Sequence, residues 1–169
     1  VERGKEWLPV EQEFTVGDAP LEITLSLQRW SHLEERGWYS GDGHNHRNPA
    51  DLPNVQLAED LNVAMPMVYW TTADSVAPRD SAQNMKGSFS AGAQSIDASH
   101  AWFSRNSEYE IFSSAGRPHT QGALLVLNHR SILDLPAQPI RQVVTRARAE
   151  GALLDLEKHN WPWTVAIVP

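Results

Sequence analysis

The chain contains no cysteine, and this absence excludes several kinds of chemistry. Without thiols there can be no disulfide framework, no thiolate nucleophile and no cysteine ligand for a metal. Any metal site must therefore be built from histidine rings and carboxylates. The seven histidines and 21 acidic residues can supply both kinds of ligand.

A cluster of basic residues is also missing. The formal net charge is −7, and the 14 lysines and arginines form no concentrated basic segment. Binding to a nucleic-acid backbone requires basic side chains gathered on one surface. We therefore exclude nucleic acid as a partner.

Long apolar runs are absent too. No run approaches the roughly 20 residues that a membrane-spanning helix needs, so we expect no membrane span. The chain starts at Val1 without an initiator methionine and without a signal sequence. We therefore expect a longer or processed chain, with its remainder as an intramolecular partner, and favour a periplasmic or extracellular location because a signal peptide can have been removed.

The first part of the chain predicts a β-hairpin at residues 13–30. Polar and apolar side chains alternate along its second strand, which is typical of a half-buried antiparallel strand. The apolar face of that strand is formed by Leu21, Ile23, Leu25 and Leu27. Because this pattern ends near residues 30–37, we divide the chain into the C-terminal part of a β-rich domain or linker, residues 1–34, and a second domain, residues 35–169.

Strands and helices alternate through the second domain, apart from a long loop at residues 74–107 that we expect to carry a short helix at 95–102. The predicted helices lie at residues 54–61 and 139–150, and the predicted strands at 62–70, 108–112, 123–127 and 152–156. This order predicts an α/β fold with a largely parallel sheet. Ligands of such sheets bind at the carboxyl ends of the strands.

His44 and His46 form an H-x-H pair in the segment Gly37–Arg47. Alternate side chains of an extended strand lie on one face, so we expect both rings and the carboxylate of Asp42 on the same side. Imidazoles with this spacing can bind one divalent ion, and Asp42 can be a ligand beside them or can orient one ring. The alternative is a polar turn that contains histidines and binds no metal.

The motif R-G-W-Y-S-G-D-G-H-N-H-R at residues 36–47 resembles the opening of the CehA/McbA-type metallohydrolases, relatives of the polymerase-and-histidinol-phosphatase (PHP) domain. Further similar segments are A-E-D-L-N-V at 58–63, G-A-L-L-V-L at 122–127 and L-D-L-E-K-H-N-W-P-W at 154–163. The resemblance implies a partial, distorted β/α barrel of PHP-like type, of which this chain holds the N-terminal half. A hairpin from an upstream β-sandwich-like domain would precede it.

The resemblance also implies metal ligands at the strand ends. His44 and His46 match the first ligand pair of the family. Glu110 matches its bridging glutamate and His119 its next histidine, for which His129 is a competing choice. In the family such ligands hold one to three divalent metals, which activate water for hydrolysis of phosphoesters, carbamates or amides.

The chain departs from the family in two motifs. Residues 70–74 read W-T-T-A-D where relatives carry T-D-H, so the Asp-His pair is lost unless Asp74 substitutes for it. Residues 157–159 read E-K-H where relatives carry A-H-P. These differences favour a single ion, zinc, manganese or iron, to which Glu157 or His159 can contribute.

We assign Asp42 and Lys158 to catalysis. Lys158 occupies the place of a ligand histidine, where it can orient an anionic substrate or stabilise charge that develops in the transition state. The alternative for Lys158 is an ion pair with Asp155 or Glu157. Substrate contacts are assigned to Arg47, Glu157, His159 and Trp161.

Two functions follow from these assignments. The first is a divalent-metal-dependent hydrolase that acts on a small-molecule or polymer substrate through a metal-activated water. The second is a non-catalytic carbohydrate- or peptide-binding module on a degenerate PHP-like scaffold, with the Trp-rich segment 161–163 as its contact surface.

Overall fold

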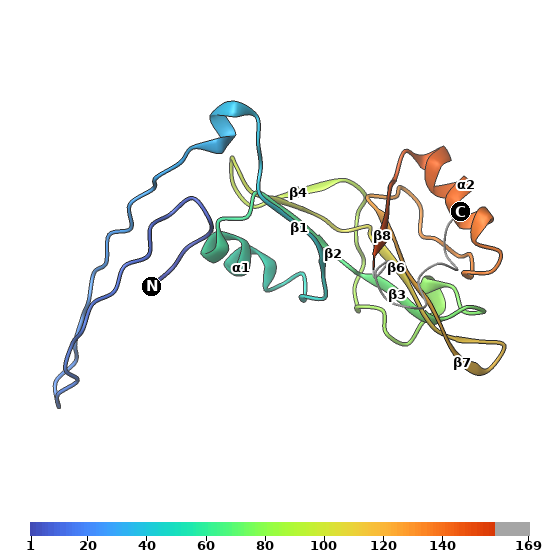
Figure 1. The fold of residues 1–169 in the computed structure, drawn as a ribbon, viewed down its shortest axis with the longest axis horizontal. Helices are drawn as coiled ribbons and strands as arrows, with labels where there is room; N and C mark the ends of the chain where they lie inside the picture. The colour runs from blue at the N-terminus through green and yellow to red at the C-terminus, as the bar shows by residue number, and fades with distance from the viewer. Residues whose placement is uncertain (158–169) are drawn as a thin grey trace.

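The computed structural model describes residues 1–157, without the side chains of residues 118–121. An extended N-terminal arm projects from a body that holds the named helices and strands (Figure 1). In chain order these are η1 (Leu33–Arg36), β1 (Gly41–Asn45), α1 (Leu52–Glu59), β2 (Val63–Pro66), β3 (Tyr69–Ala73), η2 (Pro78–Asp80), β4 (Ala93–Ser95), β5 (Ala101–Phe103), β6 (Ser107–Ser114), β7 (Arg117–Leu127), α2 (Ile140–Glu150) and β8 (Leu153–Glu157).

The strands of the described residues form two four-stranded sheets, ordered β1-β2-β5-β4 and β3-β6-β7-β8. In the first sheet β1, β2 and β5 are parallel, and β4 is antiparallel to β5. In the second sheet β3 and β6 are parallel, and β7 and β8 add to them in antiparallel order. Both sheets are therefore mixed rather than purely parallel.

The chain passes from the first sheet to the second twice, after the neighbouring strands β2 and β5. The chain passes from β2 to β3 through Met67 and Val68, and from β5 to β6 through residues 104–106. Pro66 has no N–H group to donate to a ladder, which is consistent with β2 ending there. The fully buried side chain of Asn106 fixes the crossing. Its amide nitrogen donates to the carbonyls of Pro66 (3.0 Å) and Phe103 (2.6 Å), and its oxygen accepts from the backbone N–H of Asn128 (2.9 Å).

Helix α2 covers one face of the second sheet. Its apolar stripe packs against alternate side chains of β6 and β7, in a core formed by Tyr109, Ile111, Leu124, Val126, Leu133, Ala137, Val143, Val144 and Ala147. Because side chains of a strand alternate between the two faces, Glu108 and Glu110 of β6 lie on the face away from α2. Glu157 of β8 lies on that same face, since it pairs with Ala123 and Ala123 pairs with Glu110. This carboxylate-bearing face is where the candidate site forms.

The predicted partial β/α barrel is wrong. Among residues 1–157 the strands close no barrel, and only two α-helices are present. A β/α barrel requires a helix after each strand, whereas β6 and β7 form a hairpin and β4 turns directly into the antiparallel β5. The crossing at Pro66 and Asn106 also divides the predicted strand 62–70 between two sheets.

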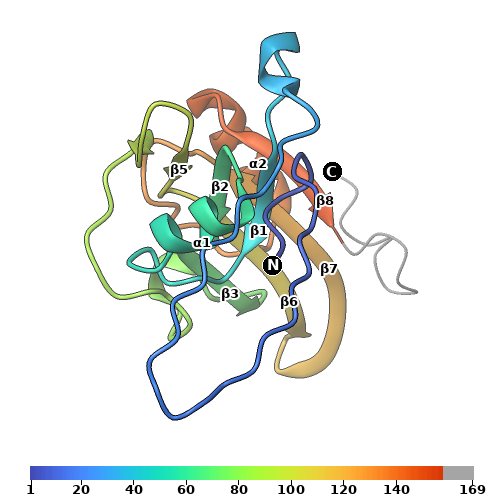
Figure 2. The same ribbon diagram turned by 90° about the vertical axis from the view of Figure 1, so that its left-hand side faces the viewer.

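The predicted hairpin at residues 13–30 is also wrong. The only pairing of the N-terminal arm within the described residues is an isolated antiparallel bridge between Trp7 and Arg29. Figure 2 shows the two legs of the arm standing apart, and no strand within residues 1–157 forms a ladder with the alternating run 21–28. The burial pattern of that run still alternates, as the sequence predicts.

Several smaller predictions are decided by the same structure. The helix predicted at 139–150 is confirmed as α2, which ends at Gly151 with φ of 74°. The turn at η1 ends at Gly37 with φ of 77°, a conformation that glycine adopts without strain. The short helix expected at 95–102 is wrong, because that segment contributes to β4 and β5. No helix within residues 1–157 has the length and apolar character needed to cross a membrane.

Candidate metal centre

A β-bulge in β1 sets the direction of the two histidines. Asp42 pairs with Ala64 and Asn45 with Pro66, so β1 has one more residue than β2 between the two pairs. The backbone N–H of His44 donates to the Asp42 carboxylate at 3.0 Å within this bulge. An extra residue shifts the alternation of side chains by one position. His44 and His46 therefore face away from Asp42, toward the second sheet.

The two histidines meet a buried carboxylate from β6. His44 Nε2 lies 3.2 Å and His46 Nε2 lies 3.0 Å from Glu108 Oε2. The two Nε2 atoms are 3.3 Å apart. Three potential ligand atoms thus form a small triangle whose corners come from both sheets, and the group can hold a metal ion.

The size of this triangle fits a divalent cation. In a tetrahedral site with metal–ligand bonds of about 2.0–2.1 Å, neighbouring ligand atoms lie about 3.3 Å apart. The three observed separations, 3.0, 3.2 and 3.3 Å, agree with that value without any movement of a side chain. Two imidazole nitrogens and one carboxylate oxygen are also a donor set that zinc, manganese and iron accept.

The group is closed on one side and open on the other. The Glu108 side chain is fully buried, whereas 20% of the His44 side chain and 35% of the His46 side chain remain exposed. The carboxylate lies on the buried side of the site and the imidazoles lie on its solvent-accessible side. Three protein ligands with an accessible further position are typical of catalytic metal sites, since structural sites are usually filled by four protein ligands.

The carboxylates make the site favourable for positive charge. The hydrogen bond with Glu108 is the main cause that raises the pKa of His44 to about 9, against the opposing effect of burial, and the charge and hydrogen bond of Glu157 add to it. An environment that stabilises a proton at this point also stabilises a metal cation.

Two further side chains hold the imidazole rings. Glu157, at the end of β8, lies 2.5 Å from His44 Nδ1. The ring of His46 packs against the ring of Trp70 from β3, with centroids 4.3 Å apart. Each histidine of the triangle therefore has a contact of its own with the second sheet.

Two other predicted site residues, one in β1 and one shortly after it, lie on a different surface. Asp42 and Arg47 line a pocket of about 340 Å³ between β1 and α1, which Asn45 also lines. The sequence predicts Asp42 beside the two rings, whereas the bulge places its side chain on the other face of β1. Its carboxylate instead accepts the backbone hydrogen bond of His44.

The carboxylate in the triangle is Glu108, whereas the sequence predicts Glu110, two residues further along β6. Glu110 lies on the same face of the strand and is also buried, and its assignment as a ligand stays a prediction. The S-E-Y-E segment signals that both glutamates share a face. Only the register of β6 against β3, in which Glu108 pairs with Trp70, distinguishes Glu108 as the neighbour of His46.

Two residues considered as alternatives lie elsewhere. His129 is fully buried, with Nε2 at 2.8 Å from Ser107 Oγ and Nδ1 at 2.5 Å from the carbonyl of Ser131. Burial lowers its pKa to about 4, so the ring is neutral at pH 7. Asp74 accepts a hydrogen bond from Ser114 at 2.6 Å. Neither belongs to the ligand group of His44, His46 and Glu108.

The remaining predicted residues cannot be placed. The side chain of His119 is among those that the structure does not describe. Lys158, His159 and Trp161 lie outside the described residues 1–157. Their assigned roles stay predictions.

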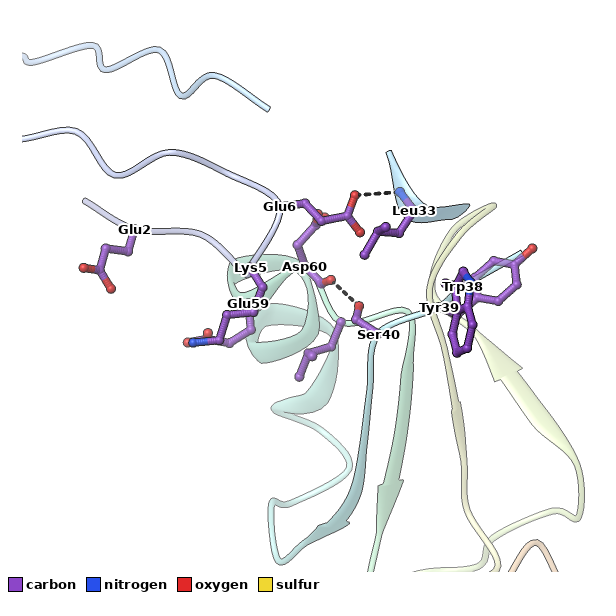
Figure 3. A pocket seen from close by; sticks show the side chains of 11 residues that line it. Glu2, Lys5, Glu6, Leu33, Trp38, Tyr39, Ser40, Glu59 and Asp60 are labelled. Carbon is purple, nitrogen blue, oxygen red and sulfur yellow. Dashed lines mark hydrogen bonds between the residues drawn. The ribbon is translucent and has the colours of Figure 1, made fainter. Parts of the chain in front are cut away.

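A separate pocket of about 490 Å³ lies at the other end of β1, where Ser40, Asp60 and Leu61 are among its lining residues. Figure 3 shows Trp38 and Tyr39 on one side of this pocket and Glu59 on the other. None of the three metal-site residues lines it. The candidate metal site therefore lies at the opposite end of β1 from this pocket.

Comparisons with known proteins add no family to this description. No protein-family model, curated protein or solved structure matches the chain.

Proposed function

We propose that the protein is a divalent-metal-dependent hydrolase, related to the CehA/McbA-type enzymes that its motifs resemble. The observation that carries the proposal is the triangle of His44, His46 and Glu108, whose edges match those of a metal-binding tetrahedron and whose outer side is accessible. The proposed ion is zinc, manganese or iron.

The three residues would hold the ion from two sides. His44 lies in β1 of the first sheet and His46 directly follows that strand, whereas Glu108 comes from β6 of the second sheet. When bound, the ion would lower the pKa of a water toward about 7 and polarise the bond to be cleaved. Buried Glu108 contributes a fixed negative charge, while the exposed edge of His46 leaves room for a substrate.

The proposed substrates are phosphoesters, carbamates or amides, because each contains an oxygen that a cation can polarise and a bond that water can cleave. In this proposal Trp70, packed against His46, forms part of the wall on the substrate side. Lys158, the next residue after the His44 partner Glu157, is proposed to orient the substrate or stabilise developing charge.

Metal analysis and turnover test the proposal together. We expect the purified protein, after incubation with zinc, manganese or iron and removal of free metal, to retain about one ion per chain and to hydrolyse at least one ester, carbamate or amide substrate. His44→Ala combined with His46→Ala should abolish both properties. The matched control is His32→Ala, because His32 is a half-exposed histidine on the segment before β1.

Each outcome has a definite meaning. Metal retained equally by the double variant refutes the assignment of the site. Stoichiometric metal binding without turnover on any of the three substrate classes refutes the hydrolase and favours a binding module on the same scaffold.

A further inference from the structure

We propose that Glu157 is the positioning residue of this centre, which holds the His44 ring so that Nε2 rather than Nδ1 faces the ion. The inference rests on the proposed metal site. It assigns to Glu157 a role different from those of a substrate contact or a metal ligand.

The contact itself defines the role. Glu157 Oε2 lies 2.5 Å from His44 Nδ1, and the ring nitrogen on the other side, Nε2, is the one that faces Glu108 and His46. An ionised carboxylate can only accept, so Nδ1–H donates to Glu157, and in a ring that binds an ion the lone pair would be on Nε2. A carboxylate that receives the second N–H of a ligand histidine fixes its tautomer and makes it a stronger base.

The same geometry separates Glu157 from the ligands. The two nitrogens of an imidazole point to different sides of the ring. In this arrangement the carboxylate therefore contacts the side of His44 that is turned away from the triangle. Glu157 acts on the ion through His44 and not by direct ligation.

The second sheet gives Glu157 a fixed position. Glu157 pairs with Ala123 of β7, and Ala123 pairs with Glu110 of β6, so the carboxylates of Glu157 and Glu108 are carried by one hydrogen-bonded sheet. His44 comes from the other sheet. Without Glu157 the ring could rotate about its broad terminal torsion, and its Nε2 would no longer be held opposite Glu108.

The two histidines differ in this respect. The ring of His46 is held by packing against Trp70, which restricts its orientation but supplies no charge. Of these two ring-holding contacts outside the triangle, the one made by a carboxylate is that of Glu157 with His44, so the effect of Glu157 should be specific to one of the two nitrogen ligands.

The test is the binding of Co²⁺ to the full chain, followed by its visible absorption, with Zn²⁺ affinity measured by competition against a chromogenic chelator. Glu157→Ala should weaken the affinity for both ions by about 10–100-fold and change the Co²⁺ spectrum, because one nitrogen ligand is no longer oriented. Glu157→Gln keeps an acceptor for Nδ1–H and should lose less. The matched control is Asp155→Asn, an exposed carboxylate two residues earlier on β8, which should bind like the wild type.

Thermal unfolding of the metal-free proteins accompanies these measurements and should show no large difference between Glu157→Gln and the wild type. If the wild type binds neither ion, the proposed function fails and this inference fails with it. If the wild type binds but Glu157→Ala binds within twofold of it with the same spectrum, the positioning role alone is overturned. An equal loss in Asp155→Asn also overturns it, since the effect would then come from general charge.

Discussion

We expect the replacement of Asn106 by alanine to destabilise the protein, because this side chain holds the place where the chain crosses between the two sheets. The side chain is fully buried and makes three hydrogen bonds, two as donor to the carbonyls of Pro66 and Phe103 and one as acceptor from Asn128 N–H. Alanine removes all three. The Pro66 carbonyl keeps its hydrogen bond from Val68 N–H (2.9 Å), whereas the part-buried N–H of Asn128 loses the Asn106 side-chain oxygen as its acceptor.

The magnitude follows from these partners. The two bonds to carbonyls contribute about 1 kcal/mol each net, and the Asn128 N–H left without its acceptor costs about 1–3 kcal/mol, so we expect a loss of roughly 3–5 kcal/mol in the free energy of unfolding. For a chain of this size that corresponds to a fall in Tm of roughly 10 °C. Asn106→Asp keeps the shape but places a carboxylate opposite two carbonyl oxygens, and it should be at least as destabilising.

Urea unfolding at pH 7 measures the effect, with Asn54→Ala as the matched control. Asn54 is exposed on α1, where alanine is the better helix former, so this variant should be within about 0.5 kcal/mol of the wild type. A loss below about 1 kcal/mol in Asn106→Ala would refute the view that this side chain holds the crossing.

Two further variants test electrostatic contacts. Burial alone would raise the pKa of Glu150, but hydrogen bonds from its neighbours lower it from 4.5 to about 2. Its contribution to stability is therefore present above pH 4.5, amounts to at most about 3 kcal/mol, and is lost as the pH falls toward 2. Urea unfolding between pH 2.5 and 6 should show a weaker pH dependence for Glu150→Gln, and equal slopes would contradict this. Asp60 accepts hydrogen bonds from Arg3 at 3.0 Å and Trp7 at 2.6 Å, so Asp60→Ala should speed tryptic cleavage of the first ten residues, whereas Glu59→Ala, an exposed neighbour, should not.

The fold could be predicted where local signals decide it. Helix α2 has an apolar stripe at helical spacing and a glycine at its end, and its bounds agree with the sequence within one or two residues. The strand predicted at 62–70 shows what local signals omit. Residues 63–66 and 69–70 do form strands, but their division between two sheets depends on the buried contact of Asn106 with Pro66, about 40 residues away.

The sequence predicts two of the three residues that form the candidate site. The H-x-H spacing identifies His44 and His46, since residues two apart on a strand face one side. The bulge that turns them away from Asp42 does not follow from the strand alternation, and the choice of Glu108 depends on the register between β3 and β6. Register is set by the packing of whole strands, so the sequence alone does not distinguish Glu108 from Glu110 as the ligand.

The proposed ligands lie far apart in the sequence, and this separation has a consequence for the stability of the folded chain. His46 and Glu108 are about 60 residues apart, so an ion bound to both would cross-link the chain much as a disulfide does, and it would disfavour the unfolded ensemble by closing a long loop. Because an ion that binds only the folded chain stabilises it by RT ln(1 + [M]/Kd), metal at a hundred times its Kd would add about 2.7 kcal/mol. In a chain without cysteine, the same three side chains would then act as a reversible cross-link between β1 and β6, and metal supply would set how tightly the two sheets are tied together.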